Sequence, residues 1–174
     1  MAGRFMFRVG SMALVVGLLS GCQSLMYGTQ YEFPKADEPS ARLLMEHPLY
    51  TSVSILNRNE EGCYAGITGV PYKDRDIDAP LVPGKETIFL YRQEVGGKVC
   101  QLHFALTPEA NATYLLKSGD WSKTEKGLFG YTHEQGYCGV AVLKKLGEKV
   151  SVEPAPQMVI DRGITCHKFV KRKR

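Results

Sequence analysis

Cysteines are the residues of this 174-residue chain whose chemistry needs assignment first. No Cys-x-x-Cys pair occurs, and Cys166-His167 is a lone neighbouring pair with no partner at metal-ligand spacing. Apart from Cys22, four cysteines remain, and an even number is typical of a disulfide framework in an exported protein. We therefore expect two disulfides, and no metal site, among Cys63, Cys100, Cys138 and Cys166.

Three pairings of these four cysteines are open, because spacing alone does not decide connectivity. We favour Cys100 with Cys138, because both fall on the apolar face of an expected strand. Cys63 then pairs with Cys166, near opposite ends of the expected domain. In the chain-entropy model, each long loop closed in this way stabilises the fold by about 4 to 5 kcal/mol.

Histidines and carboxylates form no catalytic pattern. The nucleophile motif Gly-x-Ser-x-Gly is absent, and oxidised cysteines are not nucleophiles. Asp74, Asp76 and Asp78 resemble the start of a calcium loop, but Ala79 stands where its glycine belongs and Glu86 lies one residue beyond its closing glutamate. We expect a solvated loop there, and no catalytic residue, metal or cofactor in the protein.

An apolar run ending in Cys22 is the most specific feature of the sequence. Arg4 and Arg8 precede the uncharged run 9–19, whose helix would rise only about 16 Å, roughly half the core of a bilayer. This length is typical of a signal-peptide core, and small residues precede Cys22.

Leu19-Ser20-Gly21-Cys22 resembles the lipobox of bacterial lipoproteins. The resemblance implies a diacylglyceryl group on the Cys22 thiol, cleavage after Gly21 and acylation of the new amine. Two or three acyl chains hold a protein stably on a membrane. Gln23, where Asp would signal retention at the inner membrane, implies the outer membrane.

Charge is uneven along the chain. The overall formal charge is +4, but without Arg4, Arg8 and the last seven residues acidic side chains outnumber basic ones. The composition therefore gives no indication of a nucleic-acid surface. We expect the basic end to contact anionic lipid or to be a solvated terminus; its cations are Lys168, Lys171, Arg172, Lys173 and Arg174.

Short alternating runs separated by Gly, Pro, Asp and Asn predict strands from residue 50 onward. The clearest unit is 86–107, where Gly96-Gly97 forms a two-residue turn. If Val95 pairs with Lys98, Phe89 meets Phe104 and Gln93 meets Cys100 on an apolar face. The opposite face, with Leu90 against His103, is wetter.

Other segments are expected to be irregular. We expect a helical turn at 41–46, a charged loop at 72–80 and a long aromatic loop at 120–136. Leu106-Thr107-Pro108 through Tyr114 resembles the tyrosine corner of immunoglobulin-like sandwiches, in which the hydroxyl bonds upstream backbone. A loop with a buried edge tyrosine is the alternative.

These patterns predict a mostly β protein, an antiparallel immunoglobulin-like β-sandwich of seven or eight strands. We expect a signal peptide at 1–21, a lipidated tether at 22–40, the sandwich at 41–167 and a basic tail at 168–174.

Similarity to small outer-membrane lipoproteins implies a non-enzymatic structural or adaptor module facing the periplasm or the cell surface. Its partner would be an envelope protein or polymer. One alternative is a small-ligand or metal carrier, in which the loop holding Trp121 and His133 closes a pocket against His103. Another is an envelope hydrolase, which requires titratable groups with perturbed pKa values in a cleft.

Overall fold

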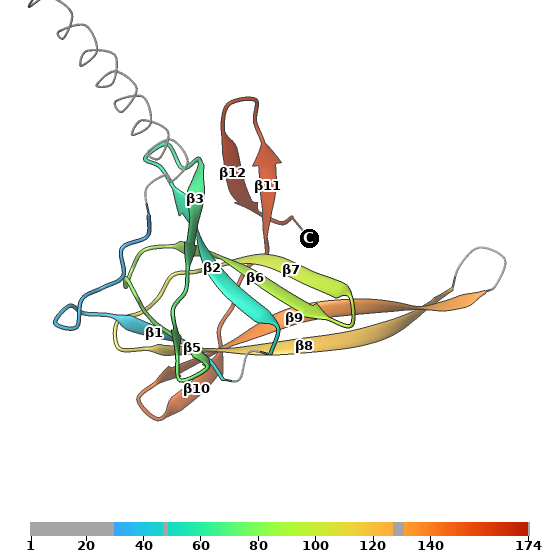
Figure 1. Cartoon of the computed structure of the whole chain (residues 1–174), viewed down its shortest axis with the longest axis horizontal. Helices are drawn as coiled ribbons and strands as arrows, with labels where there is room; N and C mark the ends of the chain where they lie inside the picture. Colours follow the sequence, from blue (N-terminus) through green and yellow to red (C-terminus); the bar gives the residue numbers. More distant parts are fainter. Residues whose placement is uncertain (1–29, 47–48, 127–130, 174) are drawn as a thin grey trace, which may run out of the picture.

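The structure is a computed structural model that describes residues 30–46, 49–126 and 131–173. Within these ranges the chain forms β-strands and no α-helix, as the sequence predicted for the class of fold (Figure 1). The predicted number of seven or eight strands is too low. The described strands are β1 (Ala41–Met45), β2 (Thr51–Arg58), β3 (Tyr64–Gly69), β4 (Tyr72–Lys73), β5 (Asp76–Leu81), β6 (Thr87–Val95), β7 (Lys98–Leu106), β8 (Thr113–Lys126), β9 (Thr132–Leu146), β10 (Lys149–Val152), β11 (Met158–Arg162) and β12 (His167–Lys171).

The strands form three sheets. The larger sheet has six strands in the order β10-β9-β8-β1-β5-β4, and the smaller has four in the order β3-β2-β6-β7. β11 and β12 form a separate two-stranded sheet. Strand β1 lies inside the larger sheet, antiparallel to β5 and parallel to β8.

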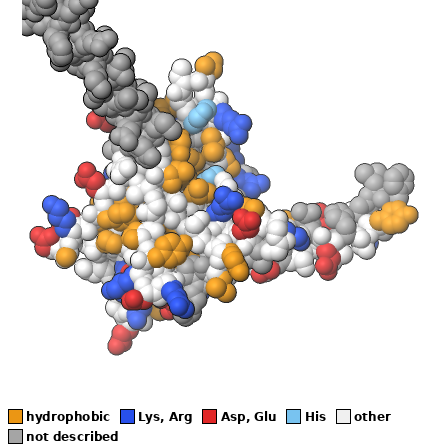
Figure 2. Space-filling model, viewed as in Figure 1, with side chains coloured by type: hydrophobic (Ala, Val, Ile, Leu, Met, Phe, Trp, Pro, Cys, Tyr) orange, Lys and Arg blue, Asp and Glu red, His pale blue; other side chains and the backbone are white. Residues whose placement is uncertain are grey.

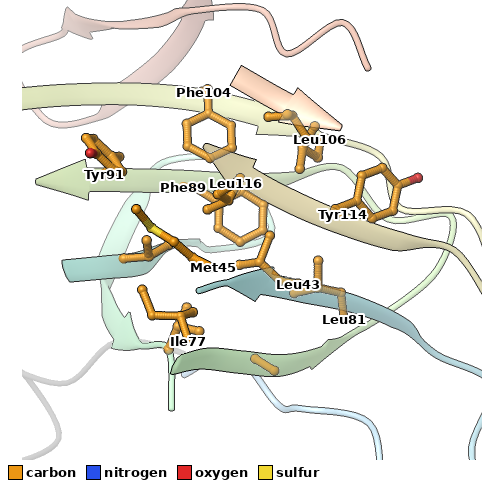
Figure 3. Packing of buried hydrophobic residues seen from close by; sticks show 14 of the residues in the cluster. Leu43, Met45, Ile77, Leu81, Phe89, Tyr91, Phe104, Leu106, Tyr114 and Leu116 are labelled. Carbon is orange, nitrogen blue, oxygen red and sulfur yellow. The ribbon is translucent and has the colours of Figure 1, made fainter. Parts of the chain in front are cut away.

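The main core lies between the two larger sheets (Figure 3). Leu43 and Ile77 from the six-stranded sheet and Phe89 from the four-stranded sheet are fully buried in one cluster. The rings of Phe89 and Phe104 stack with centroids 5.3 Å apart. Alternating side chains of β1, β2, β5, β6, β7, β8 and β9 supply this core, as expected for sheets with one covered face.

The β6–β7 hairpin has the predicted register. Phe89 pairs with Phe104, Gln93 with Cys100 and Val95 with Lys98. Gly96 and Gly97 adopt φ of 58° and 75°, the left-handed region that a two-residue turn requires and that glycine enters without a Cβ penalty.

Both predicted disulfides are confirmed. Cys100 of β7 bonds Cys138 of β9, with Cα atoms 5.9 Å apart, and so links the two large sheets. Cys63, just before β3, bonds Cys166, just before β12, with Cα atoms 5.2 Å apart. The second bond fastens the β11–β12 hairpin to the edge of the four-stranded sheet.

Two segments predicted as irregular are strands. The expected helical turn at 41–46 is wrong, because Ala41, Leu43 and Met45 alternate into the core as β1. The expected charged loop at 72–80 is also wrong, because Ile77 and Ala79 alternate inward in β5 while charged residues point outward. In both cases burial between neighbouring strands overrides a weak local preference.

The expected loop at 120–136 is mostly a pair of strands. β8 and β9 pair at 14 successive positions, from Thr113 opposite Lys145 to Lys126 opposite Thr132. We call 119–126 and 132–137 the arm, because this part projects beyond the rest of the molecule (Figure 1). Its polar sequence resembles a loop because a two-stranded ribbon in solvent has no buried face. Residues 127–130 lie outside the described residues.

The folded unit extends beyond both predicted domain boundaries. Tyr31 and Phe33, assigned to the tether, pack against the core, and the Tyr31 hydroxyl accepts a hydrogen bond of 2.7 Å from the Val82 amide. At the other end, Lys168 and Lys171, assigned to the tail, belong to β12. The predicted signal peptide and Cys22 lie outside the described residues.

Tyr114 makes the backbone contact that its sequence context predicted. The side chain is fully buried, and its hydroxyl accepts a hydrogen bond of 3.0 Å from the Glu109 amide, five residues upstream. This bond fixes the loop that leads from β7 into β8.

Candidate functional site

The β11–β12 hairpin covers part of the outer face of the four-stranded sheet. Met158 of β11 is buried there in a second apolar cluster, which Phe169 of β12 flanks. The sheet contributes Leu56, Ile88 and Ala105. Hydrophobic and histidine side chains gather on this side of the molecule (Figure 2). The hairpin therefore has a packing contact in addition to its disulfide.

Cations at the end of the chain do not form one face. In the strand register Lys168 lies opposite Asp161, with its side chain on one face of the hairpin. Lys171 lies opposite Met158, with its side chain on the other face. Arg172 is held by Gln157, whose backbone oxygen accepts from the Arg172 amide at 2.8 Å and whose side-chain oxygen accepts from Nη1 at 3.1 Å. Lys173 is exposed, and Arg174 lies outside the described residues.

His103 and His133 are not brought together. His103 is half-buried on β7, with its ring centroid 5.6 Å from that of Phe169, and loss of hydration lowers its pKa below the usual 6.5. His133 belongs to the arm, which projects beyond the rest of the molecule, whereas His103 lies on β7 in the four-stranded sheet (Figure 1). Among the described residues the expected pocket does not form, because 119–126 and 132–137 extend away from the body of the molecule (Figure 1).

Among the carboxylates of 74–78, Asp78 has a structural role. Asp78 accepts two hydrogen bonds of 2.6 Å from the Arg42 guanidinium on the neighbouring strand, and these bonds lower its pKa. Asp74 lies in the β4–β5 turn with φ of 51°. Across the described ranges, no three His, Cys, Asp or Glu side chains are grouped closely enough to hold a metal ion.

Strand β10 is an open edge of the six-stranded sheet. It is last in the strand order, and all four of its residues are exposed, with Val150 at 59% and Val152 at 74%. Its inner side pairs with β9, and the Glu153 amide continues that pairing by donating to the Val142 oxygen at 2.8 Å. Sequence reasoning recognised a strand here but missed the edge. The signal was present in the sequence Lys-Val-Ser-Val-Glu, which places two valines beside opposite charges.

Comparison with known proteins gives no relative from which to carry over a function: no family model, curated protein or solved structure matches the chain. Among the residues that the structure describes, no helix is long and apolar enough to span a membrane.

Proposed function

We propose that this protein is a lipid-anchored envelope protein of the outer membrane with a non-enzymatic structural or adaptor role. The observation that carries the proposal is the apolar run ending in Leu19-Ser20-Gly21-Cys22. Two disulfides within one small domain support it, because such bonds persist in oxidising compartments outside the cytoplasm.

The fold supports a position close to the membrane. Tyr31 is fixed on the domain by its hydroxyl and by its amide, which donates to Thr68 Oγ1 at 3.0 Å. Nine residue steps separate Cys22 from Tyr31, and a fully extended chain of that length spans about 31 Å. A lipid on Cys22 would therefore hold the domain within that distance of the bilayer surface.

A non-enzymatic role is supported by the contacts of the reactive side chains. Four cysteines are consumed in disulfides, Asp78 is paired with Arg42, and His103 packs beside Phe169. The domain would then act through its surfaces. We include in this proposal an immunoglobulin-like arrangement of the two large sheets, for which the hydrogen bond between Tyr114 and the Glu109 amide is the support.

Radioactive palmitate labelling tests the anchor directly. We expect cells that produce the natural sequence to incorporate label into this polypeptide, and the variant Cys22→Ala to incorporate none. Ser24→Ala, which leaves the thiol in place, is the matched control and should label like the natural chain. Label that persists in Cys22→Ala, or that never appears in the natural sequence, would refute the proposal.

A further inference from the structure

We propose that β10 is an interaction edge through which two copies of this chain pair, strand against strand, into one continuous sheet. The edge is open and apolar, since Val150 and Val152 are both more than half exposed. Exposed strand edges in proteins are ready templates for pairing with another chain. Three further features identify the partner strand as a second β10.

The first feature is the direction of the backbone groups. In an antiparallel pair, successive residues alternate between directing their N–H and C=O toward the partner and directing them away. The Glu153 amide bonds the Val142 oxygen, so Glu153, Ser151 and Lys149 face β9. Val150 and Val152 therefore direct their N–H and C=O groups outward, and no strand of the described ranges pairs with them on that side.

The second feature is the side-chain pattern of 149–153. Antiparallel pairing of two copies about Ser151 sets Val150 opposite Val152 of the second copy, and Val152 opposite Val150. These are the residues whose backbone groups point outward, so one register satisfies four backbone hydrogen bonds and joins four valines on one face. The same register sets Lys149 opposite Glu153 twice. If the two strands pair about Val150 or Val152 instead, only one pair of opposed valines remains, and Lys149 no longer lies opposite Glu153.

The third feature is continuity with the rest of the sheet. Val152 lies opposite Leu143 of β9, Leu143 opposite Leu115 of β8, and Leu115 opposite Leu44 of β1. This apolar row crosses four strands on the face turned away from the core and ends at the open edge. Pairing about Ser151 brings the rows of two copies together across the joint.

Five residues on each side bury less surface than most stable complexes do, so we expect the pairing to be weak in dilute solution. The pairing does not depend on the anchor. A lipid on Cys22, which rests on the proposed function, would confine copies to one membrane and raise their effective concentration.

Cross-linking at the symmetry axis tests the register. In the variant Ser151→Cys the two new thiols face each other at a pair that is not hydrogen-bonded, where Cα atoms lie about 4.5 Å apart, within the range that a disulfide spans. Mild oxidation of whole cells that produce the variant should yield a disulfide-linked dimer of this chain on a non-reducing gel. In the comparison variant Lys149→Cys the two thiols lie about 13 Å apart along the strands, and the change also removes the cation opposite Glu153. We expect at least tenfold less dimer from this variant.

Charge reversal tests the same register independently. Lys149→Glu, added to Ser151→Cys, should reduce the dimer yield, and further addition of Glu153→Lys should restore it. Mass mapping of the two native disulfides verifies that each variant folds, and acyl mass on Cys22 is read from the same sample. If Cys22 carries no lipid while Ser151→Cys cross-links selectively, the proposed anchor fails and the pairing stands. Equal yields from positions 149 and 151, or no dimer from 151 in folded protein, would overturn the pairing.

Discussion

Removal of the two disulfides, singly and together, should show how much each bond adds to the free energy of unfolding. The two bonds are nested, so the loop that one bond closes depends on whether the other is present. Cys63–Cys166 spans 103 residues and encloses Cys100–Cys138, which spans 38. With the inner bond closed, the outer bond closes an effective loop of about 65 residues, which the chain-entropy model values at about 4 kcal/mol. With the outer bond closed, the inner bond contributes about 3.5 kcal/mol.

We therefore expect Cys63→Ala/Cys166→Ala to lower the free energy of unfolding by about 4 kcal/mol, and Cys100→Ala/Cys138→Ala by slightly less. The change without all four cysteines should approach about 8 kcal/mol, comparable with the whole stability of a small domain. Cys100 belongs to the main core cluster, Cys138 packs against it, and Cys63 and Cys166 belong to neither cluster, so each variant retains the other apolar residues of both clusters. The loss of stability therefore comes mainly from the larger conformational entropy of the unfolded chain.

The assay is urea unfolding of the purified chain in mild detergent, followed by circular dichroism. Freeing a loop expands the unfolded state, so the dependence of the unfolding free energy on urea concentration should become steeper in both variants. A loss below about 1 kcal/mol in both, with an unchanged slope, would show that the bridges do not restrict the unfolded chain and would refute the loop argument.

Two further changes probe single contacts. Tyr114→Phe removes the acceptor of the Glu109 amide within a buried site, and we expect urea unfolding to show a loss of about 1 to 2 kcal/mol, whereas Tyr131→Phe, at an exposed position, should change little. Because loss of hydration lowers the pKa of His103 in the folded state, the unfolded chain binds the proton more readily, and stability should fall as pH drops below about 6.5 toward the folded pKa. In the variant His103→Gln, the urea midpoint should fall less between pH 7.5 and pH 5 than in the natural chain. An identical pH profile in both would show that His103 does not cause this fall in stability.

Sequence patterns predicted the parts of the fold that local chemistry determines. The β6–β7 register followed from two glycines and alternating apolar residues, because a one-residue slip would turn the apolar face toward water. The prediction of Cys100–Cys138 used that register, since it placed Cys100 on the inner face, and Cys63 and Cys166 were then the remaining pair.

Segments that depend on distant neighbours were not predictable in this way. β1 is a strand because β5 and β8 lie on either side of it, and the five residues of β1 do not reveal these neighbours. The arm lacks a buried face, so its polarity resembled that of a loop. Tyr31 and Phe33 were missed as core residues because prolines and charges surround them. The cations at the end of the chain could be identified from the sequence. That they lie on two different faces became apparent only from the pairing of β12 with β11.

The nesting of the two bridges has a consequence for biogenesis. In a chain that crosses a membrane with its amino end first, Cys63 and Cys100 emerge before the other two, yet they are not partners in the folded protein. An oxidant that joins thiols in order of arrival would produce two wrong crosslinks. Maturation then requires exchange through mixed disulfides, so the yield of folded protein should depend on an isomerase in the compartment that receives it.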